Sequence, residues 1–189
     1  MIIEKKTLVV ARYKENVDWI KDINHGFIVY NKGENDISIP NTRVPNEGRE
    51  SETYLRFILD FYYTLPSNMV FCQGNPFDHC VHFRELISQS YKEELVHLAH
   101  YNPTDDENGC PNHCGLDIKS ALSDLGLPNP GKFLFAAGAQ YIVSRDLIQN
   151  KSYEWWDKLY RYHQNRPDAP WIYERIWPII FNFSLSKNI

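Results

Sequence analysis

Short apolar runs divide the first half of the chain and predict buried β-strands. The runs lie at residues 6–12, 27–30 and 69–72. Because none of them alternates between apolar and polar side chains, each is typical of a strand buried on both faces, as in a parallel sheet. Apolar side chains recur at helical spacing over residues 49–64, which predicts an amphipathic helix. Its apolar positions are Tyr54, Phe57, Ile58, Phe61 and Leu65.

Helix and strand patterns continue to the end of the chain, separated by polar loops. Further helices are expected at residues 14–23, 80–91, 116–125, 144–148, 152–163 and 170–183, and further strands at 133–135 and 140–143. The polar stretches 34–48 and 100–115 are interpreted as loops, and the acidic run 105–107 as solvated. The early alternation of strands and helices predicts an α/β sandwich with a mostly parallel sheet. The length of 189 residues fits a single domain spanning residues 1–189.

Composition and charge narrow the range of partners. The chain carries 20 Lys and Arg against 24 Asp and Glu, for a net charge of −4. It shows no basic stripe of the kind that nucleic-acid binders present. The longest apolar run near the N-terminus, Leu8 to Ala11, is shorter than a signal-peptide core or a membrane span requires. We therefore expect no nucleic-acid partner, no membrane span and a cytoplasmic location.

The four cysteines allow two interpretations. They are Cys72, Cys80, Cys110 and Cys114. Without a secretion signal, reduced thiols are expected rather than disulfides. Cys110, His113 and Cys114 lie within five residues and include ligand types that zinc uses, but a loop with incidental soft side chains explains them as well.

The sequence motifs of several common enzyme classes are absent from this chain. It contains neither of the glycine-rich phosphate loops, G-x-G-x-x-G and G-x-x-x-x-G-K-[ST], and no G-x-S-x-G elbow. Because those loops supply the close backbone approach to a phosphate or the exposed nucleophile, the sequence argues against a dinucleotide oxidoreductase, a P-loop ATPase and a serine hydrolase.

Polar clusters follow the predicted strands, at the place where open α/β sheets bind ligands. Arg12-Tyr13-Lys14-Glu15 comes directly after the first strand, and Asn31-Lys32 follows the second. An arginine at such a position can pair with a phosphate or stack on a base, although a solvated charge group at a helix start explains it equally well. Arg49 also suits an anion, helped by the free N–H groups at the start of the helix over 49–64.

The segment after the third strand, Gln73 to His79, ends in a carboxylate and an imidazole. Asp78 and His79 could hold a divalent cation whose shell is completed by diphosphate oxygens and water. In the alternative interpretation the segment is a turn, and Asp78 caps the following helix.

Glu174 lies on a predicted helix between large aromatic side chains, with Trp171 and Trp177 three residues away on either side. A carboxylate held against aromatic surface can have a raised pKa and act as a general base. An ordinary Glu174–Arg175 polar face beside core tryptophans is the alternative.

Six sequence motifs in a fixed order carry a resemblance to a known family. They are 9–15, 29–33, 46–54, 71–76, 138–144 and 174–178, spread over about residues 7–181. Together they resemble the DUF3431 family of domains, which looks related to nucleotide-sugar glycosyltransferases of the GT-A type. The resemblance implies a Rossmann-like α/β/α sandwich that binds a nucleotide sugar, often with Mn²⁺ or Mg²⁺.

By this resemblance, residues after the strands line the nucleotide-sugar pocket, and the turn 138–140 faces the sugar or the acceptor. The implied binding residues are Arg12, Tyr13, Glu15, Asn31, Arg49, Glu50, Gln73, Asn75, Gly138, Ala139 and Gln140. Asp78 and His79 take the place of the metal-binding Asp-x-Asp motif, which occurs nowhere in this sequence, and would hold the Mn²⁺ or Mg²⁺. Glu174 matches the acidic residue near the acceptor hydroxyl and is the expected catalytic base.

The expected activity is transfer of a sugar from a nucleotide-sugar donor, a UDP-sugar first of all, to a saccharide or glycan acceptor. A cation, Arg49 or Arg12 would stabilise the negative charge that grows on the leaving diphosphate. Glu174 would take the acceptor proton, which gives inversion, whereas retention needs another arrangement. Two other functions stay open. They are a hydrolase that uses Asp78, His79 and Glu174, and a non-catalytic sugar- or protein-binding module on the same fold.

Overall fold

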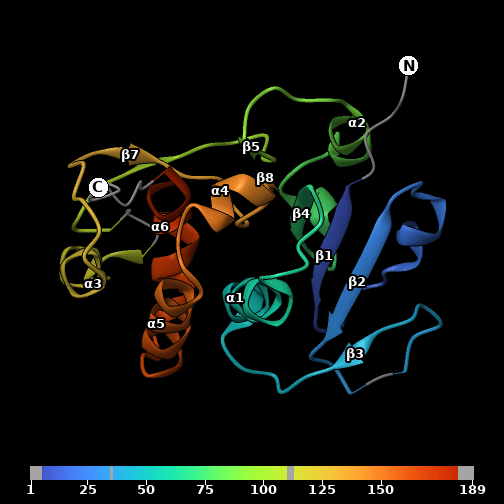
Figure 1. Ribbon diagram of the computed structural model, residues 1–189, viewed down its shortest axis with the longest axis horizontal. Coiled ribbons are helices and arrows are strands. Elements are labelled where there is room, and N and C mark those ends of the chain that lie inside the picture. The colour runs from blue at the N-terminus through green and yellow to red at the C-terminus, as the bar shows by residue number, and fades with distance from the viewer. Residues whose placement is uncertain (1–5, 35, 110–112, 183–189) are drawn as a thin grey trace.

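A six-stranded sheet forms the centre of the computed structural model, which describes residues 6–34, 36–109 and 113–182. In spatial order the strands are β3 (Thr42–Arg43), β2 (Gly26–Asn31), β1 (Thr7–Arg12), β4 (Asn68–Gln73), β8 (Tyr141–Ser144) and β5 (Leu95–His97). The first four are parallel, and β8 runs antiparallel to both of its neighbours. The prediction of an α/β domain with a mostly parallel sheet is therefore confirmed (Figure 1).

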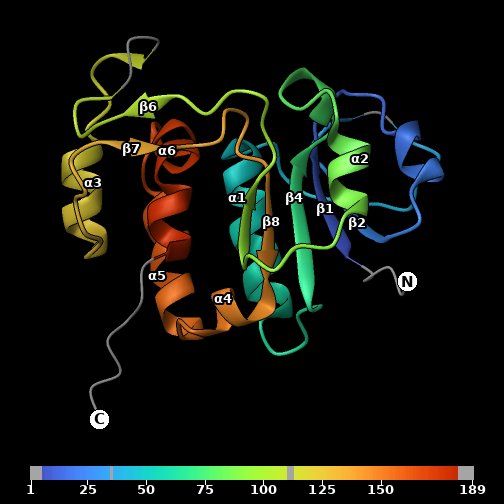
Figure 2. The ribbon, with the colours of Figure 1, turned by 90° about the horizontal axis from the view of Figure 1, so that it is seen from above.

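The sheet is buried on both faces, as its continuous apolar strands predict. Because successive side chains of a strand point to opposite faces, Val9 and Phe71 join one hydrophobic core, whereas Val10 and Cys72 join another. The first core lies under α1 (Arg49–Phe61), α5 (Tyr153–Gln164) and α6 (Ala169–Asn182), and the second under η1 (Asp18–Asp22) and α2 (Phe83–Ser88). Figure 2 shows α1 and α2 on opposite sides of the sheet.

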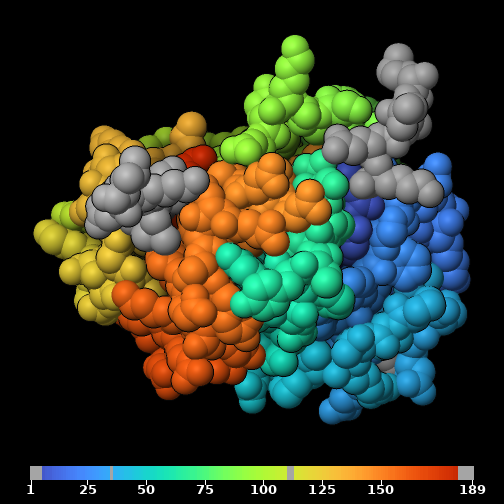
Figure 3. All heavy atoms as spheres, viewed as in Figure 1, coloured from blue at the N-terminus to red at the C-terminus, as the bar shows by residue number. Residues whose placement is uncertain are grey.

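Four further elements extend the larger of these two layers: β6 (Thr104–Asp105), α3 (Ile118–Leu125), β7 (Phe133–Leu134) and α4 (Arg145–Gln149). The short 3-10 helix η2 (Pro76–Asp78) belongs to the smaller layer, where Phe77 packs against Trp19 and Phe83. Ser144 begins α4 by accepting a hydrogen bond from the Leu147 N–H at 3.1 Å, as its position before an apolar turn predicts. From the side drawn in Figure 1, α1, α4 and α5 form one packed surface next to the β2–β3 region (Figure 3).

The predicted helix over 14–23 is the clearest difference between pattern and structure, because only the short 3-10 helix η1 forms there. The Glu15 carboxylate accepts the Tyr13 N–H at 2.7 Å, and the Asn16 side chain accepts the Asp18 N–H at 2.7 Å. Such local side-chain bonds offer the backbone an alternative to a helix. They hold the segment after β1 open as a turn.

The predicted loops 34–48 and 100–115 contain the two-residue strands β3 and β6. Strands this short carry no readable alternation. The interpretation of the acidic run 105–107 as solvated is wrong for Asp105, which is buried and pairs with the buried Arg175 at 2.9 Å. This ion pair anchors the segment to α6.

Among the cysteines, Cys72 and Cys80 are buried free thiols, and burial raises the pKa of both. Cys110 lies outside the described residues, so zinc binding between Cys110 and Cys114 and the thiol state of these two residues stay predictions. In the described part of the chain, no helix has the length and apolar character needed to cross a membrane.

Candidate functional site

The carboxyl ends of β1, β2 and β4 meet at one edge of the sheet. The chain continues from β1 to β2 and β3 on one side, whereas β4 lies on the other side of β1. Such a reversal of strand order is the place where open α/β sheets bind ligands. A pocket of about 320 Å³ opens there. It is lined by Ala11, Arg12, Tyr13, Glu15, Lys32, Asn46, Arg49, Glu50 and Gln73.

A second pocket, of about 660 Å³, continues the first along the ends of β2 and β3 and shares Tyr13, Lys32 and Asn46 with it. The two together are called the switch-point groove here. Its charged residues are five cations, Arg12, Lys14, Lys32, Arg43 and Arg49, and three acids, Glu15, Glu34 and Glu50. Lys32 and Arg43 are paired with carboxylates outside this lining, Glu52 at 2.7 Å and Asp36 at 2.6 Å. The positive charge that favours an anionic ligand therefore comes chiefly from Arg12, Lys14 and Arg49.

Arg12 is fixed at the end of β1 by its neighbours. Its side chain donates from Nη1 to Asn31 Oδ1 at 2.6 Å and from Nε to the Glu15 carbonyl at 3.1 Å. Arg12 and Asn31 are also register partners in the parallel β1–β2 pair. The expected neighbourhood of the two strand-end clusters is therefore confirmed.

Gly33 allows β1 and β2 to come together at the floor of the groove. A Cβ atom at this position would lie 1.8 Å from the Tyr13 carbonyl oxygen and 2.8 Å from Arg12 Nη1. The first contact is with backbone and cannot be relieved by a side-chain rotation.

We expect Gly33→Ala to lower the free energy of unfolding by about 1–3 kcal/mol, because overpacking forces backbone shifts of this cost. Gly26→Ala is the matched control at the other end of β2, where a Cβ would meet its nearest neighbour, Thr7 Oγ1, at an ordinary 3.5 Å. Urea unfolding of both variants checks the prediction. Equal stability of the two variants would contradict the close approach at Gly33.

Arg49 stands at the start of α1 with its side chain available to a ligand. Its guanidinium lies 5.8 Å from the ring centre of Trp171 on α6, and 58% of the side chain is exposed. Within the described chain, Arg49 and Ala139 are the two non-glycine residues with positive φ, at 51° and 52°. Backbone strain of this kind clusters at functional sites. Arg49 contacts Trp171, three residues before Glu174, and Ala139 follows Gly138, whose N–H bonds to Glu174.

Glu174 is held beside the groove on α6. Its Oε1 accepts the Gly138 N–H at 2.9 Å, Arg175 Nη1 lies 3.4 Å from Oε2, and the side chain is 20% exposed. Since Trp171 and Glu174 are three residues apart, they lie on the same face of the helix, and Trp171 contacts Arg49. The carboxylate therefore lies near the Arg49 end of the groove.

Glu50 is the second carboxyl group at this end. It is buried, and burial raises its pKa, while its own backbone N–H and Arg49 act in the opposite direction. The negative charge of Glu174 raises the pKa of Glu50 further. The carboxyl groups of Glu50 on α1 and Glu174 on α6 are thus close enough to interact electrostatically.

The other predicted site residues do not line the groove. Gln140 is buried and donates to the Pro76 carbonyl at 3.0 Å, and Ala139 is buried. Asn75 lines a different pocket. Their binding roles stay predictions.

Asp78 is exposed on η2 and lines none of the pockets described here, so the structure does not bring it together with Arg12. The His79 ring packs against Gly138, where a Cβ would approach it to 2.5 Å. Across residues 6–34, 36–109 and 113–182, no group of three His, Cys, Asp or Glu side chains is arranged to hold a metal ion. The predicted site uses two side chains and completes its shell with diphosphate oxygens and water, so the metal site at Asp78 and His79 stays a prediction.

A buried network lies beneath the start of α1. Lys32 donates to Glu52 Oε2 at 2.7 Å, and Arg56 and Tyr160 reach Glu52 Oε1. Nearby, Nε2 of His163 lies 2.7 Å from Ser51 Oγ. Burial lowers the pKa of His163 to about 4.

Acid is expected to destabilise the protein through His163. Because its pKa falls from 6.5 in the unfolded chain to about 4 on folding, the unfolded state binds more protons between these values, and stability falls as pH falls through this window. From pH 7 to pH 4.5 the His163 contribution is a loss of roughly 2 kcal/mol. Urea unfolding at both pH values measures it, with His163→Gln as the comparison. An equally steep loss in His163→Gln would contradict the assignment.

These features define an α/β protein with a cationic groove at the switch point of its sheet. The family model described as "Protein of unknown function (DUF3431)" matches residues 8–187, and the chain belongs to this family. Comparison with curated proteins gave no match, and comparison with solved structures gave none either.

Sequence reasoning missed several parts of the groove. Arg43 and Asn46 line it, but they lie in a stretch that was interpreted as a loop, since β3 has only two residues. The sequence predicts that Trp171 lies beside Glu174, but no local pattern predicts its contact with Arg49. Pro40 and Pro45 lie on either side of Thr42–Arg43. Because proline in sheets is confined to edge strands, strand starts and bulges, these two residues are the sequence feature that could have indicated β3.

Proposed function

We propose that this protein is a glycosyltransferase that takes a sugar from a nucleotide-sugar donor bound in the switch-point groove. The observation that carries the proposal is the cluster of cationic side chains at the carboxyl ends of β1, β2 and β3, next to a positioned carboxylate. The strand order β3-β2-β1-β4 matches the first four strands of dinucleotide-binding Rossmann sheets. This likeness supports the Rossmann-like character that the family resemblance implies.

The diphosphate of the donor would lie against Arg12 and Arg49, which supply hydrogen bonds and charge without a metal in this arrangement. Tyr13, 41% exposed and shared by both parts of the groove, offers an aromatic face for the base. The larger part of the groove, about 660 Å³ on the β2–β3 side, would take the nucleotide, and the smaller part, about 320 Å³ at Glu50, would take the sugar.

In the reaction, the bond from the sugar carbon to the diphosphate oxygen breaks, and the acceptor oxygen forms the new bond to that carbon. The electron pair stays on the diphosphate, where Arg49 and Arg12 stabilise its charge. The acceptor hydroxyl passes its proton to Glu174. The Gly138 N–H at Oε1 fixes the orientation in which Glu174 receives it.

A thermal-shift screen of UDP-, GDP-, ADP- and CMP-sugars, with and without Mn²⁺, tests the proposal. A donor at 100 times its dissociation constant should add about 2.7 kcal/mol of stability. Because the binding is to cations, the shift should shrink as salt is raised. Absence of a shift with every nucleotide sugar would contradict the proposal and favour a non-catalytic module. Release of free sugar without transfer to any acceptor would favour a hydrolase.

A further inference from the structure

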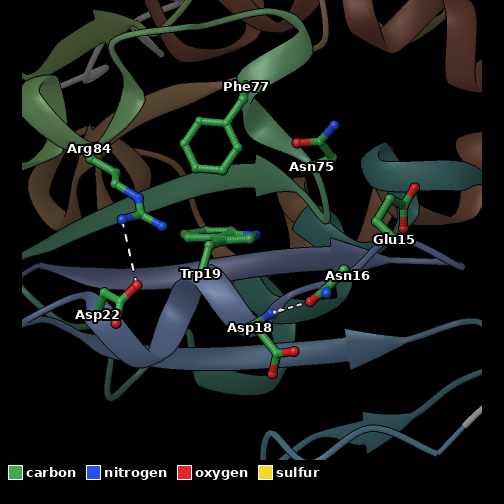
Figure 4. A pocket seen from close by; sticks show the side chains of 8 residues that line it. All are labelled: Glu15, Asn16, Asp18, Trp19, Asp22, Asn75, Phe77 and Arg84. Carbon is green, nitrogen blue, oxygen red and sulfur yellow. Dashed lines mark hydrogen bonds and ion pairs between the residues drawn. The ribbon is translucent and has the colours of Figure 1, made fainter.

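A separate pocket lies on the η1–α2 face of the sheet and adjoins the switch-point groove. It has a volume of about 530 Å³ and shares Glu15 with the groove. Its lining residues are Glu15, Asn16, Asp18, Trp19, Asp22, Asn75, Phe77 and Arg84 (Figure 4). This pocket is called the η1 pocket here. No residue other than Glu15 is common to the two sites.

The floor of the η1 pocket is aromatic and rigidly held. Trp19 contacts Phe77 edge-to-face, with ring centres 5.7 Å apart at 81°, and contacts Phe83 beneath in the same manner. The Trp19 indole N–H donates to the Gly74 carbonyl at 2.8 Å, which ties the floor to the end of β4. Trp19 itself is only 8% exposed, whereas Phe77 is half-buried. The aromatic surface offered to a flat ligand is therefore chiefly the Phe77 ring, which its contacts with Trp19 and Phe83 hold in place.

The rim of the η1 pocket is polar and predominantly acidic. Asp18, Asp22 and Glu15 supply carboxylates, Asn16 and Asn75 supply amides, and the sole cation of the lining is Arg84 (Figure 4). The Arg84 guanidinium lies 3.6 Å from Asp22 and 5.6 Å from the ring centre of Phe77. Asp18 is paired with Lys21, which lies outside the lining, at 2.5 Å. The rim therefore offers many hydrogen-bond acceptors and keeps a small negative balance, unlike the cationic switch-point groove.

We propose that the η1 pocket binds a neutral or amino-bearing saccharide and holds remote sugar units of the acceptor. An aromatic floor suits the C–H face of a sugar ring, and carboxylates and amides at the rim suit its hydroxyl groups. The acceptor role rests on the proposed glycosyltransferase function. The contact through Glu15 places the pocket directly beside the donor groove, so a chain of two or three sugars bridges them.

An NMR titration that follows the Trp19 indole N–H tests this assignment, with Trp19→Phe identifying the resonance. Cellotriose, chitotriose and mannotriose are the probes, and trigalacturonic acid is the anionic comparison. At least one neutral trisaccharide is expected to shift the signal saturably, and trigalacturonic acid is expected to leave it unchanged. No shift with all three neutral probes, or binding of trigalacturonic acid, would overturn the proposal. A lysine-rich peptide that shifts the signal in their place would also overturn it.

Two variants locate the binding. Phe77→Ala should weaken the trisaccharide at least about tenfold, as loss of an aromatic contact does. Arg84→Gln, which changes a half-exposed side chain and leaves the floor intact, should weaken it about threefold or more. Glu85→Gln, the next residue on α2 but outside the pocket, is the matched control and should bind as the unchanged protein does.

Nucleotide-sugar stabilisation, measured on the same three variants, separates this proposal from the donor site. It should be unchanged in all of them, because none of these residues lines the switch-point groove. Saccharide binding without any nucleotide binding would support the η1 pocket as a saccharide site and would contradict the proposed transferase function. Equal saccharide affinity in a folded Arg84→Gln variant and in Glu85→Gln would overturn the assignment to this pocket.

Discussion

Glu174→Gln is expected to slow sugar transfer by about 10²–10⁴-fold, the usual contribution of a general base. Glutamine keeps the size of the side chain and can still accept the Gly138 N–H at its oxygen, so the fold and nucleotide binding should be retained. Transfer rate, melting temperature and donor affinity, all measured on this one variant, test whether Glu174 is the general base.

The matched control for Glu174 is Glu154→Gln on the surface of the neighbouring helix α5. A surface substitution of this kind shifts stability by less than about 0.5 kcal/mol and should leave transfer unchanged. If Glu174→Gln were stable and fully active, Glu174 would have no catalytic role, and Glu50 would be the carboxyl group to test next. Reduced stability with normal transfer would make Glu174 a structural anchor of the Gly138 turn.

Asp105→Asn should be strongly destabilising. The Asp105 and Arg175 side chains are 1% and 2% exposed and lie 2.9 Å apart. Removing the carboxylate takes away the nearest counter-charge of a buried guanidinium and leaves it the longer contact with Glu174 at 3.4 Å, at a cost of about 3–5 kcal/mol. Asp36→Asn removes a similarly short contact, 2.6 Å to Arg43, from a carboxylate that is 99% exposed. That control should cost less than about 1 kcal/mol.

Denaturant unfolding compares the two variants. Similar losses of unfolding free energy in Asp105→Asn and Asp36→Asn would show that the Asp105–Arg175 pair is solvated in solution. A large loss confined to Asp105→Asn would show that the buried ion pair holds β6 against α6, the helix that carries Glu174.

The sheet and most helices could be predicted because their patterns are local. The apolar run at Leu8–Val10 and the helical spacing of Tyr54, Phe57 and Ile58 appear directly in the sequence, and all six side chains are buried. β3 and β6 could not be predicted, since two residues carry no period. The 3-10 helix η1 differs from the predicted helix because Glu15 and Asn16 bond to nearby backbone N–H groups.

The candidate site was predictable in part for the same reason. Arg12 and Asn31 follow strands, and the parallel register brings strand ends together, so their contact follows from position alone. Contacts made across the fold, such as Arg49 with Trp171 or Asp105 with Arg175, join residues far apart in the sequence and leave no local pattern. The exposure of Asp78 depends on how the turn after β4 is oriented, which its residue types do not fix.

Calorimetric titration of the nucleotide sugar selected by the screen, into the unchanged protein and into Arg49→Gln, tests the central claim most directly. Arg161→Gln, which removes a 74% exposed cation on α5 that does not line the groove, is the matched control. A groove that binds the diphosphate predicts saturable 1:1 binding, weakened about tenfold or more in Arg49→Gln, as expected for a charge-assisted contact, and unchanged in Arg161→Gln. Equal affinity in all three proteins, or no binding to the unchanged one, would contradict a donor site at the switch point.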